Sequence, residues 1–139
     1  MVPAQGDVQQ IVQSRLPGKV VAREIMSSPP ITIGPDQSVI ELAALLSKHR
    51  ISGVLVVDEQ GTLCGVATEA DVIERPGERV FEVMTANAAV VTEDAPVEQI
   101  ADLFVRHRIK RVPVVRDKKP VGVVSRADIV RAIGQSWRG

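Results

Sequence analysis

Two stretches of the chain decide its fold: Gly65-Val66-Ala67-Thr68-Glu69-Ala70-Asp71, the first motif, and Gly122-Val123-Val124-Ser125-Arg126-Ala127-Asp128, the second motif. In each, an apolar segment leads to a hydroxyl residue, and a carboxylate follows three residues later. A hydroxyl at the start of a helix caps free backbone amides, and a carboxylate in the first turn complements the helix dipole. The same amides favour a bound phosphate, and the carboxylate suits the hydroxyls of a ribose. Capping and ligand binding are therefore both open at these motifs.

The two motifs are corresponding parts of an internal repeat. His49-Arg50-Ile51 recurs as His107-Arg108-Ile109 at an offset of 58 residues. After a one-residue deletion the offset becomes 57, which aligns the two motifs with each other. A unit of about 58 residues is marginal as an independent fold. We therefore expect an α+β fold in which two tandem units pack sheet to sheet as one module with pseudo-two-fold symmetry.

Each repeat predicts the same order of elements, β-α-β-β-α. Ser38 and Glu41 fit a capping box before the first helix, and Pro96 suits the first turn of its counterpart. Apolar residues then recur at helical spacing in both repeats, at Val39, Leu42, Ala43 and Leu46 and at Val97, Ile100, Ala101 and Phe104. Unbroken β-branched runs are typical of buried strands. The expected strands are Val54–Val57, Leu63–Ala67, Val112–Val115 and Val121–Val124, and the last helices begin near Glu69 and Arg126.

The order of these elements divides the chain into four parts. Residues 1–19 form an N-terminal arm, in which Val8, Ile11 and Val12 indicate a short helix that ends at Pro17-Gly18. The first unit spans residues 20–75 and the second spans residues 76–134. Residues 135–139 are expected to be a tail.

Composition favours a soluble cytoplasmic protein that is not an enzyme. Hydrophobic residues make up 45% of the 139 residues, charged residues make up 24%, and the net charge is +0. We see neither a secretory signal nor an apolar run of the ~18 residues that a membrane helix needs. A single cysteine, Cys64, excludes a disulfide within the chain and is expected to be a small core residue. The sequence shows no nucleophile–base pair, metal cluster or phosphate-binding loop.

Charge is distributed unevenly along the chain, which leaves a second function open. Residues 1–105 carry seven Lys and Arg against fifteen Asp and Glu, a net charge of −8, whereas residues 106–131 carry nine against two, a net charge of +7. The basic segment could bind nucleic acid through its phosphates. An aromatic content of 2% argues against base stacking.

The duplicated motifs resemble tandem cystathionine-β-synthase (CBS) domains. Each motif follows an apolar run such as Arg111-Val112-Pro113-Val114-Val115, and each repeat opens with a segment of the type Ile25-Met26-Ser27 or Val83-Met84-Thr85. The resemblance covers roughly residues 20–134. It implies a disc-like pair with two clefts between the units, which in this family often bind AMP, ADP, ATP, S-adenosylmethionine or, less often, NAD-type ligands. The implied function is a regulatory, ligand-sensing module whose geometry changes with the ligand and which requires no cofactor.

The resemblance also assigns roles to residues of this chain. The motif aspartate would hold the ribose, the motif hydroxyl and basic residues before the apolar run would hold phosphate, and the first short strand would line the adenine. The residues implied are Asp128, Ser125, Arg111, Lys110, Pro113, Val91 and Thr92 in the second repeat, and Asp71, Thr68, Ile31 and Ile33 in the first.

The two implied sites differ in charge. The first repeat has Ser52-Gly53 where the second has Lys110-Arg111. Because charge-assisted contacts are roughly twice as strong as neutral ones, we expect the site with Asp128 to be the better nucleotide site. The site with Asp71 is expected to be weak or empty.

The family further implies a homodimer that forms through helices, with Ile129, Val130 and Ile133 as candidate contacts. The chain ends soon after the second repeat, so we expect a stand-alone module that acts on an effector protein of unknown identity. A structural dimerisation module with empty clefts is the remaining alternative.

Overall fold

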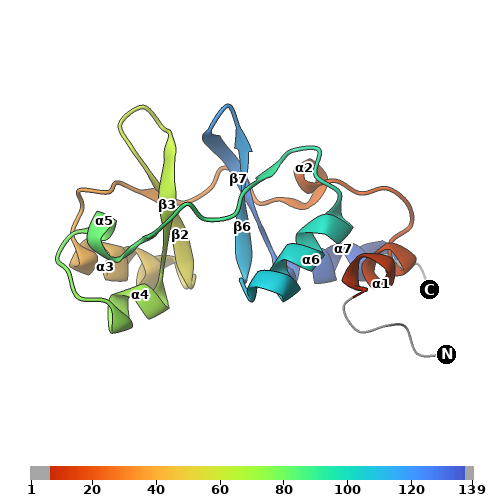
Figure 1. Cartoon of the computed structure of the whole chain (residues 1–139), viewed down its shortest axis with the longest axis horizontal. Coiled ribbons are helices and arrows are strands. Elements are labelled where there is room, and N and C mark those ends of the chain that lie inside the picture. Colours follow the sequence, from red (N-terminus) through yellow and green to blue (C-terminus); the bar gives the residue numbers. More distant parts are fainter. Residues whose placement is uncertain (1–6, 137–139) are drawn as a thin grey trace. The chain divides into compact units, whose positions relative to one another are not determined.

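The computed structural model describes residues 7–136, which form two compact units. We name each after the first 11-residue helix of its repeat. The α3 unit comprises residues 29–89 and 117–120, and the α6 unit comprises residues 7–28, 90–116 and 121–136. Each unit contains one small sheet with its helices on one side (Figure 1). The predicted α+β class is confirmed, as is the order β-α-β-β-α in both repeats.

The α3 unit has a four-stranded sheet in the order β1-β2-β3-β4. The strands are β1 (Thr32–Ile33), β2 (Gly53–Val57), β3 (Leu63–Thr68) and β4 (Thr85–Ala86), and the helices are α3 (Val39–His49), α4 (Glu69–Glu74) and α5 (Val80–Val83). Strand β1 runs parallel to β2, while β2 with β3 and β3 with β4 are antiparallel. Leu42 and Leu46 of α3 pack with Val54 and Val56 of β2 in the core.

The α6 unit has a three-stranded sheet in the order β5-β6-β7. The strands are β5 (Val91–Thr92), β6 (Arg111–Arg116) and β7 (Lys119–Ser125), and the helices are α1 (Val8–Arg15), α2 (Ala22–Ile25), α6 (Val97–His107) and α7 (Arg126–Ser136). All four residues of the predicted apolar stripe of α6 are buried. The predicted N-terminal helix is present as α1, and its Val12 and Leu16 join this core.

The opening segments of the two repeats are exchanged between the compact units. Helix α2 belongs to the first repeat but packs in the α6 unit, whereas its repeat counterpart α5 packs in the α3 unit. Backbone bonds of matching length fix both segments: Val97 N–H donates to Val20 O at 2.9 Å, and Val39 N–H donates to Glu78 O at 2.9 Å. Each core is therefore completed by a segment that the sequence assigns to the other repeat.

Several details differ from the sequence-based expectations. Pro96 is the N-cap of α6 and precedes its first turn, because the helix begins at Val97. Helix α7 continues to Ser136, two residues into the expected tail, and residues 137–139 lie outside the described residues. Arg50 and Arg108 are the C-cap residues of α3 and α6, and both adopt the left-handed conformation, each at φ 53°.

Among residues 7–136, none of the helices has the length and apolar character needed to cross a membrane.

Candidate functional site

The first motif forms a closed set of hydrogen bonds where β3 meets α4. Thr68 is the N-cap of α4, and its backbone N–H and Oγ1 donate to Asp71 Oδ2 at 2.8 and 3.0 Å. The backbone N–H of Asp71 donates back to Thr68 Oγ1 at 3.3 Å. Asp71 is only 7% exposed. The geometry is that of a capping box with an aspartate as its acid.

The second motif repeats this geometry between β7 and α7. The backbone N–H and Oγ of Ser125 donate to Asp128 Oδ2 at 2.8 and 3.0 Å, and Asp128 N–H donates to Ser125 Oγ at 3.3 Å. Asp128 is 4% exposed. The capping role expected of both motifs is therefore confirmed.

An arginine occupies the second oxygen of each motif carboxylate. Arg75 Nε lies 3.4 Å from Asp71 Oδ1, and Arg131 donates from Nη1 to Asp128 Oδ1 at 2.8 Å. Both guanidinium groups are about half exposed, so solvent reaches one side of each ion pair. Each buried carboxylate therefore has hydrogen-bond or ion-pair partners, and its arginine is the partner that faces solvent.

The remaining expected site residues lie in the same unit as their motif. Lys110 is exposed, Arg111 begins β6 and is partly buried, and Pro113 is buried within that strand. The backbone N–H of Arg126, in the second motif, donates to Lys110 O at 3.3 Å, which places the basic pair next to that motif.

The residues expected to line adenine lie in the short strands β1 and β5 or, for Ile31, directly before β1. Thr32 and Thr92 are exposed, while Ile31 and Val91 are partly buried. Ile33 is only 3% exposed and packs in the core of the α3 unit. The Ile33 side chain is therefore a core residue and is not exposed for the adenine contact expected of it.

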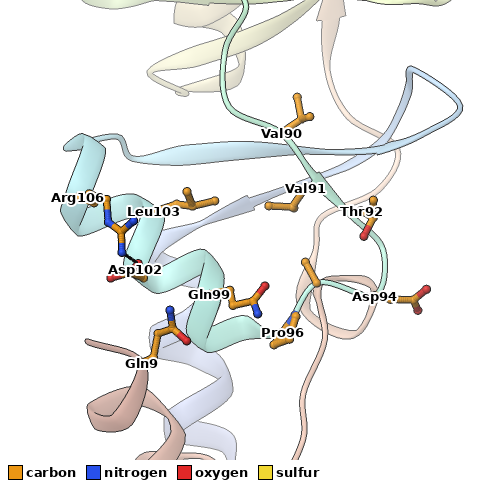
Figure 2. Close-up of a pocket in the computed structure, with 11 residues that line it drawn as sticks. Gln9, Val90, Val91, Thr92, Asp94, Pro96, Gln99, Asp102, Leu103 and Arg106 are labelled. Carbon is orange, nitrogen blue, oxygen red and sulfur yellow. Dashed lines mark hydrogen bonds and ion pairs between the residues drawn. The ribbon is translucent and has the colours of Figure 1, made fainter. Parts of the chain in front are cut away.

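A groove of about 540 Å³ lies within the α6 unit, beside β5 and α6 (Figure 2). Val91 and Leu103 are among its apolar residues, and an ion pair between Asp102 and Arg106 stands at one end. The groove includes Val91 and Thr92 of the expected site but neither Ser125 nor Asp128. It therefore does not coincide with the second motif.

Comparison with known proteins adds a direct family match over most of the chain. The CBS domain family matches residues 22–78 and 80–135. The chain belongs to the CBS domain family. Both matched segments contain one copy of the capped hydroxyl–carboxylate motif, so the chain carries a CBS pair.

Two solved CBS pairs resemble the chain over nearly their full length. One is a CBS domain pair in complex with 5′-methylthioadenosine and S-adenosyl-L-methionine, at 35% identity and a TM-score of 0.79, covering 86% of this chain and 99% of that chain. The other is CBSX2 of Arabidopsis thaliana in complex with AMP, at 27% identity and a TM-score of 0.80, covering 83% of this chain and 96% of that chain.

Curated relatives of this CBS pair include larger enzymes. The chain is 36% identical over 118 residues to L-aspartate semialdehyde sulfurtransferase of Methanocaldococcus jannaschii, and 33% identical over 113 residues to inosine-5′-monophosphate dehydrogenase of the same organism. The alignments cover 82% and 79% of the chain but only 23% of each relative. The chain thus spans about a quarter of the length of these relatives.

Sequence reasoning missed the arginines that pair with the motif carboxylates. Arg75 follows Asp71 by four residues and Arg131 follows Asp128 by three, both spacings at which side chains meet on a helix. The signal was therefore present, and it could have been found by extending each motif by one helical turn.

Within residues 7–136, the two histidines and the cysteine lie outside the two motifs. His49 and His107 are the last residues of α3 and α6. Cys64 lies in β3 beside the core, and burial raises the pKa of its thiol. Among residues 7–136, no group of three or more His, Cys, Asp or Glu side chains could hold a metal ion.

Proposed function

We propose that this CBS pair is a regulatory module that binds an adenine nucleotide or a related adenosyl compound at its two motifs. The observation that carries the proposal is the duplicated, buried carboxylate that caps a helix while its second oxygen faces an arginine exposed to solvent. Support comes from relatives of similar fold that were crystallised with AMP, S-adenosyl-L-methionine and 5′-methylthioadenosine.

The second motif would bind a nucleotide through groups of one unit. Ribose hydroxyls would donate to Asp128 Oδ1 in exchange for the Arg131 guanidinium, while Oδ2 stays bound to Ser125. Phosphate would be held near Ser125 by Lys110 and Arg111, because charge-assisted hydrogen bonds to phosphate are strong. Val91 and Thr92 would line the adenine, with Pro113 as a rigid neighbour in β6.

The first motif offers the same ribose contacts in the α3 unit. Asp71 Oδ1 is held by Arg75 at 3.4 Å, and Arg75 Nη1 also donates to the carbonyls of Val83 and Met84 at 3.4 and 3.3 Å. Thr68 would contact the group attached to the ribose, and Ile31 would line the base. The site lacks the basic pair of the second motif.

The regulated activity also belongs to the proposal. Several relatives are CBS pairs crystallised by themselves and others are CBS regions of enzymes. We propose that this chain is not itself catalytic, that it works in the cytoplasm as a homodimer, and that binding is read out by an effector protein. In this proposal the nucleotide acts as a signal and not as a required cofactor.

The nucleic-acid alternative loses support at the basic segment. Three of its arginines are paired within the α6 unit: Arg106 with Asp102, Arg116 with Glu93 and Arg131 with Asp128. Cations that are already paired release fewer counterions when they meet a phosphate backbone. Binding of single-stranded or duplex nucleic acid is thus less favoured than binding of a nucleotide.

A thermal-melt screen tests the proposed function. The chain is melted alone and with AMP, ADP, ATP, S-adenosylmethionine or NADH. A ligand at a hundred times its Kd adds about 2.7 kcal/mol, which is roughly 8 °C for a chain of this size. We expect such a shift for at least one adenine compound, reduced in Asp71→Asn or Asp128→Asn. The matched control is Asp36→Asn, an exposed aspartate outside both motifs. A chain that no compound stabilises would contradict the proposal.

A further inference from the structure

The residues that flank the two motifs occupy corresponding positions but carry opposite charge. In the α3 unit, Glu69 N–H donates to Ser52 O at 2.9 Å. In the α6 unit, Arg126 N–H donates to Lys110 O at 3.3 Å. Glu69 and Arg126 each directly follow the motif hydroxyl, so the same backbone bond joins the same two repeat positions in both units. Residues of different charge therefore occupy equivalent positions in the two units.

The charge difference between the two flanks is large. The first motif is flanked by Ser52, Gly53 and Glu69, with a net charge of −1, whereas the second is flanked by Lys110, Arg111 and Arg126, with a net charge of +3. Each motif carboxylate is paired with one arginine, so the two ion pairs add the same net charge to the two sites. The difference in local charge comes from the flanks.

The added cation of the second flank is held in place. Arg126 Nε donates to Ile109 O at 3.4 Å and its Nη2 donates to Phe104 O at 3.3 Å, at the end of α6. These bonds hold the guanidinium beside the end of α6, next to the segment that contains Lys110. A positive charge is thus fixed near the backbone that flanks the second motif.

We propose that the two sites select ligands of different charge. The second site takes adenine nucleotides through their phosphates, and the first site takes adenosyl compounds without phosphate, either neutral thioethers or cationic sulfonium compounds. A nucleoside monophosphate carries about two negative charges near neutral pH. Glu69 repels such a group and attracts a sulfonium. The first site is then a site of different specificity, in contrast to the weak or empty site expected from the sequence.

This inference rests on the proposed function, because it assumes that the motif carboxylates hold a ribose. The inference adds a ligand class for each of the two carboxylates. The two ideas fail in different ways: loss of all adenosyl binding removes both, whereas binding without a division between Asp71 and Asp128 removes only the inference.

Titration calorimetry on the full chain separates the two sites, with AMP and 5′-methylthioadenosine as probes. We expect Asp128→Asn to abolish AMP binding and to leave 5′-methylthioadenosine binding unchanged. Asp71→Asn should have the reverse effect. Asn retains an acceptor for the helix cap, so both variants should fold, and circular dichroism checks this. If both probes lose their site through the same substitution, the proposal is overturned.

Charge exchange at exposed flank residues gives a test that leaves both capping boxes intact. Glu69→Arg should create a site for AMP in the α3 unit and weaken S-adenosylmethionine there by about tenfold, while Arg126→Glu should weaken AMP by about tenfold at the second site. Lys48→Glu, an exposed charge change on α3, is the control and should alter neither affinity by more than about twofold. Unchanged affinities in Glu69→Arg and Arg126→Glu would also overturn the proposal.

Discussion

At the scale of single residues, glycine within each motif allows a close backbone approach. A Cβ at Gly65 would lie 2.5 Å from the backbone oxygen of Thr85, in the neighbouring strand β4. A Cβ at Gly122 would lie 2.5 Å from Met26 Sδ and 3.0 Å from Ser27 O. The two glycines are repeat counterparts, but one meets rigid backbone and the other meets chiefly a flexible side chain.

We expect Gly65→Ala to lower the free energy of unfolding by about 1–3 kcal/mol, because backbone must shift to admit the methyl group. Gly122→Ala should cost less, since the Met26 side chain can move. Gly134→Ala is the control: nothing lies within 4 Å of its Cβ position on α7, and alanine is the better helix former. Urea unfolding measures all three, and a Gly65→Ala variant as stable as Gly134→Ala would contradict the close approach.

At the scale of elements, α3 begins with the capping box that the sequence predicted. Ser38 N–H donates to Glu41 Oε1 at 3.1 Å, and Glu41 N–H donates to Ser38 Oγ at 3.0 Å. The hydrogen bond from the Ser38 backbone is the main cause that lowers the pKa of Glu41. A carboxylate whose pKa is lower in the folded chain stabilises the fold above its unfolded pKa, and this contribution is lost as the pH falls through the folded value.

The capping box therefore predicts a pH-dependent part of the stability. The wild-type chain should lose more free energy of unfolding between pH 6 and pH 3 than Glu41→Gln does, because the glutamine does not titrate. Ser38→Ala should cost about 1 kcal/mol at both pH values and retain most of the pH dependence, since the backbone donor remains. Urea unfolding at the two pH values decides this. Equal pH dependence in the wild-type chain and in Glu41→Gln would refute it.

At the scale of the whole molecule, the repeats leave one apolar position exposed in both copies. Ile73 on α4 and Val130 on α7 correspond in the repeat and are 83% and 67% exposed. Ile129, one of the contacts expected for a dimer, is 6% exposed and belongs to the core of the α6 unit, so it is not available. Val130 is the better candidate.

We expect the chain to be a dimer in solution and Val130→Asp or Ile73→Asp to shift it to the monomer, because a buried charge without a partner opposes association. Ile40→Asp is the matched control. Ile40 is 81% exposed on α3, but its repeat counterpart is Glu98, so apolar character is not shared at that position. Analytical ultracentrifugation measures the three variants. A wild-type monomer, or a dimer that survives both substitutions, would contradict the prediction.

Sequence periodicity determined the local structure of this chain. The apolar stripes of α3 and α6, the unbroken runs of β2 and β6 and the hydroxyl caps of α4 and α7 all follow from residues within one turn or strand of each other. The repeat offset then identified the motif residues and their flanks. Which ligand they bind stays a prediction, because a hydroxyl and a carboxylate at this spacing serve a cap and a ribose equally well.

Only the tertiary structure decided which segments complete each core. Helix α2 and helix α5 pack in the unit of the other repeat, although nothing in their local sequence distinguishes the two choices. The tertiary structure also placed Ile33 and Ile129 inside cores and paired Arg116 with Glu93. Propensity and periodicity act over a few residues, whereas burial and long-range ion pairs depend on which distant segments meet, and that is set by packing of the folded chain.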